Sequence, residues 1–93
     1  MISYDETKRQ NNIHNHGLDF IGCEVVFAGF TITREDVRDD YGELRLQTLG
    51  MWEGMVVFVV HVARGEKDHI ISIRKAEKHE ERIYWKNHPD RRP

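Results

Sequence analysis

The chain has one cysteine, two prolines and no long apolar run, and each scarcity excludes a class of protein. The single thiol, Cys23, excludes an internal disulfide and any cysteine-rich metal site. The longest apolar run, Met55 to Val60, is far shorter than the ~20 residues that a membrane-spanning helix needs. The N-terminus lacks the apolar segment of a secretory signal, so we expect a cytoplasmic protein with no membrane association.

An excess of charge of either sign is also missing. The 93 residues include 14 Lys and Arg against 16 Asp and Glu, which gives a formal net charge of −2 at pH 7. This balance makes no global case for nucleic-acid binding, although clustered cations leave room for a local basic patch. With 39% hydrophobic and 32% charged residues, we expect one small globular domain over residues 1–93, with 88–93 as a flexible tail.

The clearest pattern in the chain lies between Met55 and Ala76, which is typical of two β-strands followed by a helix. In its first strand the odd and the even positions are both apolar, as expected of a strand in the middle of a sheet that is covered on both faces. Polar residues at the ends of such strands are the first candidates for chemistry. Four of them interrupt or end these two strands: His61, Arg64, Arg74 and Lys75.

Helical patterns flank the strands. Asp5 is a suitable N-cap for a first helix that Gly17 ends, and Ile2 to Tyr4 before it is compatible with a brief strand. A second helix is predicted from Asp19 to about Gly29, with its apolar residues on one face. A third is predicted over residues 76–87 and has only a narrow apolar stripe, so we expect it to be loosely docked.

Between the second and third helices the period changes to two. Residues 31–37 alternate loosely, residues 43–51 alternate clearly, and short turns at 52–54 and 64–68 join the later strands. Short turns favour an antiparallel meander. The fold class that we predict is α+β, with N-terminal helices and a C-terminal helix packed on a four-stranded antiparallel sheet.

An ordered set of residues gives the chain a family resemblance. The set is Asp5-x-x-Lys8-x-x-x-Asn12, His16-Gly17-x-x-Phe20, Gly42-Glu43-x-Arg45, Gly50, His61-x-x-Arg64, Ser72-x-Arg74-Lys75-Ala76, Arg82 and Tyr84. In this order and spacing, from about Tyr4 to Trp85, the chain resembles the BrnT family of bacterial toxins. The resemblance implies a RelE-like fold with helices on an antiparallel sheet.

The resemblance also implies a function. It is that of the toxin of a type II toxin–antitoxin system, a metal-independent endoribonuclease that cleaves RNA and inhibits translation. The implied partner is a cognate antitoxin of the ribbon-helix-helix type, through which alone the toxin would contact DNA. No cofactor is expected, and the six histidines show no metal-ligand spacing on one element.

Two other functions stay open from the residues. One is a non-catalytic module with the toxin fold, which only complexes its antitoxin and co-regulates their promoter. The other is a housekeeping RNA-binding domain.

Cleavage of RNA without a metal needs a base for the 2′-OH, cations for the phosphorane and an acid for the 5′-oxygen. Arginine suits the second task because its fork binds two phosphate oxygens, and histidine suits either proton transfer. We therefore expect a catalytic set in which Tyr84 positions or stacks on a nucleotide. The set is His61, Arg64, Arg74 and Tyr84.

Further residues are predicted to bind RNA, namely Lys8, Arg45 and Lys75, and Glu43 is an alternative base. Each candidate also has an ordinary structural interpretation. His61 fits a hydrogen-bonded core histidine, the arginines fit surface ion pairs, and the ring of Tyr84 fits a core cap. Sequence alone leaves these alternatives open.

Overall fold

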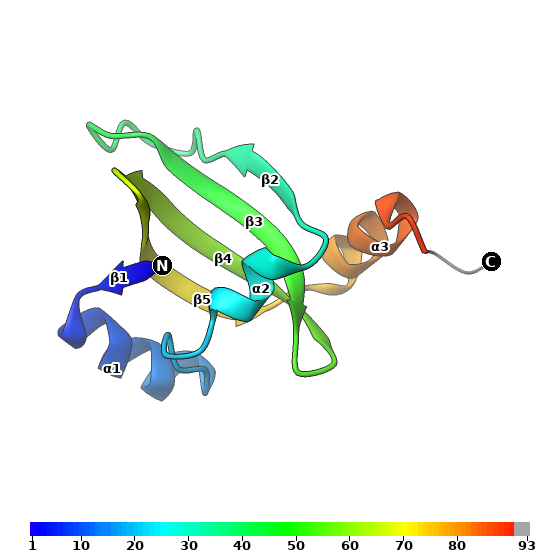
Figure 1. Cartoon of the computed structure of the whole chain (residues 1–93), viewed down its shortest axis with the longest axis horizontal. Helices are drawn as coiled ribbons and strands as arrows, with labels where there is room; N and C mark the ends of the chain where they lie inside the picture. The colour runs from blue at the N-terminus through cyan, green and yellow to red at the C-terminus, as the bar shows by residue number, and fades with distance from the viewer. Residues whose placement is uncertain (91–93) are drawn as a thin grey trace.

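A five-stranded mixed sheet organises the computed structural model, which describes residues 1–90. The strand order is β1-β5-β4-β3-β2, with β4 near the centre (Figure 1). The elements in chain order are β1 (Ile2–Tyr4), α1 (Glu6–His16), α2 (Glu24–Ala28), β2 (Ile32–Glu35), β3 (Arg45–Trp52), β4 (Met55–Arg64), β5 (Lys67–Lys75) and α3 (Lys78–Asn87). No helix in this part of the chain is long and apolar enough to cross a membrane.

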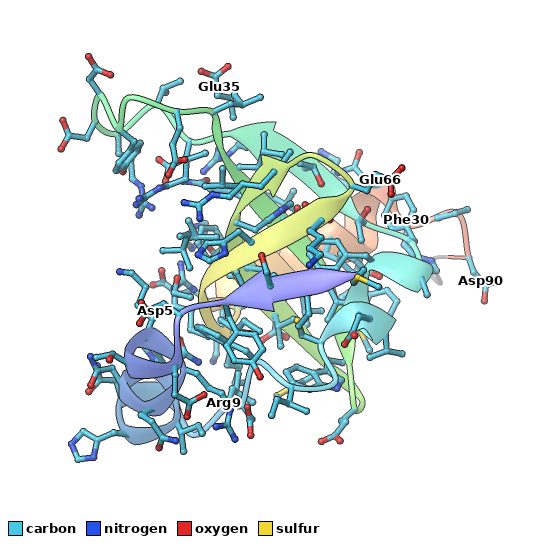
Figure 2. The ribbon with its side chains drawn as sticks, turned by 60° about the vertical axis from the view of Figure 1, so that its left-hand side comes forward. Asp5, Arg9, Phe30, Glu35, Glu66 and Asp90 are labelled. Atoms are coloured by element: carbon cyan, nitrogen blue, oxygen red, sulfur yellow. The ribbon has the colours of Figure 1, made fainter. Side chains whose placement is uncertain are left out.

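The predicted α+β class is confirmed, but the predicted four-stranded antiparallel sheet is wrong. The fifth strand is β1, which lies beside β5 and runs parallel to it, with Ile2 opposite Asp68 and Tyr4 opposite Ile70 (Figure 2). β1 has only three residues, which is too few to show alternation, and its partner strand β5 lies more than sixty positions away along the chain. The periodicity of the sequence therefore carries no signal for this pairing.

Both hairpins that the turn residues predict are confirmed. Glu53 and Gly54 join β3 to β4 with φ angles of 51° and 82°, the left-handed values that a tight two-residue hairpin requires. Gly65, with φ of 62°, turns β4 into β5. These two turns set the register of the strands next to them, and a bulge between Val60 and His61 shifts the β4–β5 register by one residue beyond it.

The sheet buries a different cluster on each face, and β4 contributes to both. We call one side the α2 face. Its core cluster consists of Phe20, Cys23, Val26, Val57, Val59, Ile70 and Ile73. We call the other side the α3 face, and its cluster consists of Leu49, Val56, Phe58, Val60, Ala76 and Tyr84.

Two helices are shorter than predicted. α2 begins at Glu24 instead of Asp19, because the Asp19 carboxylate accepts hydrogen bonds from Ile21 N and from the Arg9 side chain and so closes a turn. α3 begins at Lys78 instead of Ala76, whose N–H still bonds Val56 O and continues the β4–β5 pairing.

A buried amide attaches α1 to the sheet. Asn12 is 5% exposed, and its Nδ2 donates to Leu18 O at 2.8 Å and to Ile73 O at 2.9 Å. Its Oδ1 accepts from Ile73 N at 3.0 Å. The side chain thereby supplies β5 with the hydrogen-bond partners that β1 is too short to provide.

The predicted flexible tail, residues 88–93, lies partly outside the described residues. Within them, His88 packs against the rings of Phe30 and Tyr84, with centroids 5.0 and 5.5 Å away. Its neighbour Trp85 is 5.1 Å away. His88 therefore belongs to the folded domain, contrary to its assignment to the tail.

Gly50 provides a test of the packing between β3 and α2. A Cβ built on Gly50 would lie 2.5 Å from Val26 Cγ1 and 3.3 Å from Val26 O. We expect Gly50→Ala to lower the free energy of unfolding by about 1–3 kcal/mol, because an extra methyl in a filled core forces its neighbours to shift. Denaturant titration measures this, with Gly29→Ala as control, since a Cβ there meets nothing within 4 Å. Equal effects of the two substitutions would contradict the close packing.

Candidate functional site

His61 is a core residue on the α2 face and is 4% exposed. Its Nε2 lies 2.7 Å from Thr48 Oγ1, and its Nδ1 lies 2.9 Å from Asp68 Oδ1. The ring also meets Phe27 edge-on, with centroids 5.0 Å apart. Since both nitrogens are engaged and the ring is covered, His61 takes the hydrogen-bonded core position that its sequence context left as an alternative.

Arg74 lies on the opposite face, where it holds α3. Its two terminal nitrogens donate to the Glu80 carboxylate at 2.8 and 3.0 Å, and its guanidinium lies 4.1 Å from the centroid of the Phe58 ring. Burial opposes the charge of Glu80, but the hydrogen bonds from Arg74 and from Glu77 N outweigh it and hold the Glu80 pKa below its ordinary value. A cation engaged on a ring and a carboxylate has little capacity left for phosphate.

Tyr84 closes the core of the α3 face. The residue is 1% exposed, and its hydroxyl donates to Phe30 O at 2.9 Å. Burial raises the pKa of the phenol above its ordinary value. A ring buried in this way cannot stack on a nucleotide while α3 is docked. Tyr84 therefore caps the core, which is the structural alternative that its sequence context left open.

The predicted convergence of His61, Arg64 and Arg74 is therefore wrong. Successive residues of a strand point to opposite faces, which puts His61 on one side of β4 and Arg64 on the other. Arg74 shares the face of Arg64 but pairs with Phe58, six residues away along β4, or roughly 20 Å. The sequence could not show this because the face and register of each residue depend on pairing.

A different set of polar residues gathers at the open end of the α3 face, away from α3. Arg45 pairs with Val62, and Val62 pairs with His69, so the arginine and the histidine flank one valine on one face. Their backbones are roughly 10 Å apart, two strand spacings. Arg64 has the same parity as Val62. We call Glu43, Arg45, Arg64 and His69 the open-end cluster.

His69 is the titratable centre of the open-end cluster. Burial and the positive charge of Arg64 lower its pKa below the ordinary 6.5, and Lys8 acts in the same direction. Glu43 and Asp5 oppose this effect. The His69 Nδ1 lies 2.9 Å from Ser3 Oγ on β1, and Nε2 forms no hydrogen bond with residues 1–90. The imidazole is thus held in place by one nitrogen and neutral near pH 7, as a general base must be.

The two arginines of the cluster are weakly neutralised. Arg64 reaches Glu43 at 3.5 Å, a long contact for an ion pair with half-exposed partners. Arg45 stacks on Tyr41, with its guanidinium carbon 3.8 Å from the ring centroid, and its Nε is buried without a partner among the described residues. Both side chains therefore retain capacity for an anion.

Two other predicted RNA contacts lie at different places. Lys8 is exposed on α1, and its charge reaches His69. Lys75 is exposed at the far end of β5, beside Met51, Met55 and Trp85. The structure thus associates Lys8 with the open-end cluster and separates Lys75 from it.

Sequence reasoning missed His69. The predicted turn over residues 64–68 would have set His69 opposite Ala63, on the other face. The two-residue turn that the structure has at 65–66 sets it opposite Val62 instead, on the face of Arg64. Ser3, which orients the ring, was not accessible to this reasoning since it comes from the unpredicted parallel strand.

One group of side chains in the described part of the chain has ligand atoms close enough for a metal ion. Glu77, His79 and Glu80 place these atoms within 4.8 Å of one another. Glu80, however, is bound to Arg74 through both oxygens, and it forms a capping box with Glu77 at the start of α3. The group is explained as a helix cap, and nothing further indicates a metal.

A comparison with protein families identifies the family of this chain. A family model described as "Ribonuclease toxin, BrnT, of type II toxin-antitoxin system" matches residues 4–80. The chain belongs to the BrnT family. No curated protein matches it significantly. The match covers the whole open-end cluster and ends in α3 before Tyr84.

Membership in the BrnT family carries a function at a coarse level. The chain is a toxin of a type II toxin–antitoxin system with ribonuclease activity, so its substrate is RNA and its partner is an antitoxin protein. The resemblance found in the sequence is thereby confirmed.

The anchoring role of Arg74 is testable through α3. We expect Glu80→Gln to lower the free energy of opening α3 by about 1 kcal/mol, because the charge-assisted pair with Arg74 is lost. Hydrogen exchange of the α3 amides measures it, with the exposed Glu66→Gln as control. Unchanged protection of α3 in Glu80→Gln would show that the ion pair does not hold the helix.

Proposed function

We propose that this BrnT toxin is a metal-independent endoribonuclease whose site is the open-end cluster, and that it inhibits translation by cutting RNA. The observation that supports this is the position of His69, which is neutral, fixed by Ser3 and on the same face as Arg45 and Arg64. A base and two cations on one face are what 2′-OH attack on the adjacent phosphate requires.

In the proposed reaction His69 Nε2 removes the proton from the 2′-OH. The 2′-oxygen attacks phosphorus, and Arg45 and Arg64 stabilise the charge that develops on the non-bridging oxygens. The bond to the 5′-oxygen breaks, this oxygen takes a proton from water, and the hydroxide so formed takes the proton that His69 carries. Lys8 contacts a flanking phosphate, and Glu43 holds Arg64 until RNA replaces it.

The antitoxin in this proposal is a ribbon-helix-helix protein that covers the open-end cluster. Two large apolar side chains near the cluster support a protein contact there, since Val37 is 77% exposed and Leu44 is 54% exposed. An antitoxin bound over the cluster would prevent RNA from binding and so neutralise the toxin. The toxin would contact DNA only through this antitoxin.

Substitution of the cluster tests the catalytic assignment. We expect His69→Ala and Arg45→Gln each to lower kcat/KM for RNA cleavage by about 100-fold or more, because a general base and a phosphorane contact each supply that order of rate. Cleavage in the presence of EDTA should match the untreated rate. His14→Ala, at an exposed position of α1, is the matched control.

Other outcomes would change the assignment in defined ways. Loss of activity in Glu43→Gln but not in His69→Ala would make Glu43 the base. Full activity in both His69→Ala and Arg45→Gln would remove the site from the open-end cluster. A folded wild-type toxin that cleaves no RNA would support the non-catalytic binding module.

The pH profile gives a second test. Because burial and Arg64 lower the pKa of His69, the acid limb of kcat/KM should lie below pH 6.5. Arg64→Gln removes one cause of the lowering and leaves Glu43 unopposed, so the limb should move to higher pH while the rate falls. An unmoved limb would mean that His69 is not the titrating base, and Arg82→Gln is the control.

A further inference from the structure

A second feature of the α3 face lies beside the open-end cluster. It is a pocket of about 140 Å³ between the sheet and α3. This volume is well below the roughly 300–1,000 Å³ of sites for larger ligands, and it suits one planar ring system. The walls are mostly apolar, and they come from Ile32, Leu49, Phe58 and Ile83.

The apolar walls are arranged as two opposed sides. Leu49 and Phe58 are cross-strand partners and lie side by side on the sheet, and Ile83 faces the pocket from α3. Ile83 is 45% exposed, so this side is open to solvent and a ligand can enter without unfolding. Flat apolar surfaces of this kind are suited to the faces of an unstacked nucleobase.

The polar edge of the pocket presents donors. Arg34 Nε donates to Gln47 Oε1 at 2.8 Å, and because arginine can only donate, this contact fixes the orientation of the amide. The Gln47 Nε2 and the two terminal nitrogens of Arg34 form no hydrogen bond within residues 1–90. Gln47 is 6% exposed, so its amide is held in place by its surroundings.

The one carboxylate in the lining, Glu80, already accepts three hydrogen bonds. Glu80 Oε1 accepts from Arg74 and from Glu77 N at 2.8 Å each, and Oε2 accepts from Arg74 at 3.0 Å. His79 lies on the exposed rim. The lining side chains that keep unused donors are therefore the buried Gln47 and the exposed Arg34.

An edge whose free groups are mostly donors favours bases with adjacent acceptors. Guanine has two adjacent acceptors, O6 and N7, and cytosine has O2 and N3. Along the edges of adenine and uracil, donors alternate with acceptors. Two adjacent protein donors would therefore meet one acceptor and one donor of the base, and one hydrogen bond would not form. Arginine paired with guanine is also the commonest specific contact of this type.

The pocket lies within reach of the open-end cluster. Arg45, Gln47 and Leu49 alternate along β3 and share the α3 face, so the pocket begins about 7 Å from the proposed phosphate contact. This separation is comparable to the span from a phosphate across its ribose to the base. An RNA strand can therefore occupy both sites at once.

We propose that this pocket is a specificity subsite that holds one nucleobase next to the cleaved phosphate, and that it accepts guanine or cytosine over adenine or uracil. The proposal rests on the ribonuclease site proposed above, but the binding of a base can be measured without cleavage. The two proposals can thus fail separately.

Binding is tested on the purified free toxin with GMP, CMP, AMP and UMP as probes. NMR titration should move the side-chain amide signals of Gln47 and the ring signals of Phe58. We expect half-saturation by GMP and CMP at concentrations at least three-fold lower than by AMP and UMP. Equal binding of all four nucleotides, or no response of these signals to any of them, would overturn the proposal.

Cleavage provides the second readout, as the ratio of cuts next to G or C to cuts next to A or U. Gln47→Glu keeps the bond from Arg34 but replaces the donor with an acceptor, and it should lower this ratio at least five-fold. Ile83→Trp fills the pocket from an exposed position and should abolish the preference. Ile21→Trp, at a position 54% exposed outside the pocket, is the matched control.

The outcomes separate the two proposals. Cleavage with no base preference, or with a preference that neither pocket variant changes, overturns the subsite and leaves the ribonuclease site standing. Selective binding of GMP and CMP by a toxin that cleaves nothing supports the subsite and removes the catalytic assignment of the cluster.

Discussion

The burial of β4 on both faces is the constraint on which the rest of the structure depends. Five consecutive residues, Val56 to Val60, are at most 7% exposed. They can be covered only if one layer packs on each side of the sheet. The N-terminal segment with α2 forms one layer and α3 forms the other, and each layer decides which strand residues remain open to a ligand.

The two covers are unequal, and this inequality decides which polar residues stay accessible. The α2 face is filled by aromatic and aliphatic side chains, so a histidine there becomes a core residue, as His61 does. The α3 face is covered only at one end, where Arg74 and Tyr84 hold the helix. Its other end keeps His69 and two arginines beside a small pocket, and this is where we propose that RNA binds.

Much of the fold was predictable because it depends on local signals. Alternation placed the three central strands, and the glycines at 54 and 65 placed their turns. The pairing of β1 with β5 had no such signal, and neither did the hydrogen bonds of Asn12 to the edge of β5. A helix was predicted to begin at Asp19 because an apolar helical pattern follows it, but the Asp19 carboxylate closes a turn and binds Arg9 instead.

By itself, the sequence determined the class of the fold, the central hairpins and the family, since these follow from residue order and spacing along the chain. Tertiary structure alone decided which polar residues meet. An odd or even position along a strand decides which face of the sheet a residue lies on. Only the strand pairing shows which residues of other strands lie beside it, and only the packing of the helices shows which of these residues are buried. For that reason His61 and Arg74, which stand out in the sequence, lie buried or anchored on opposite sides, and His69 shares a face with Arg45 and Arg64.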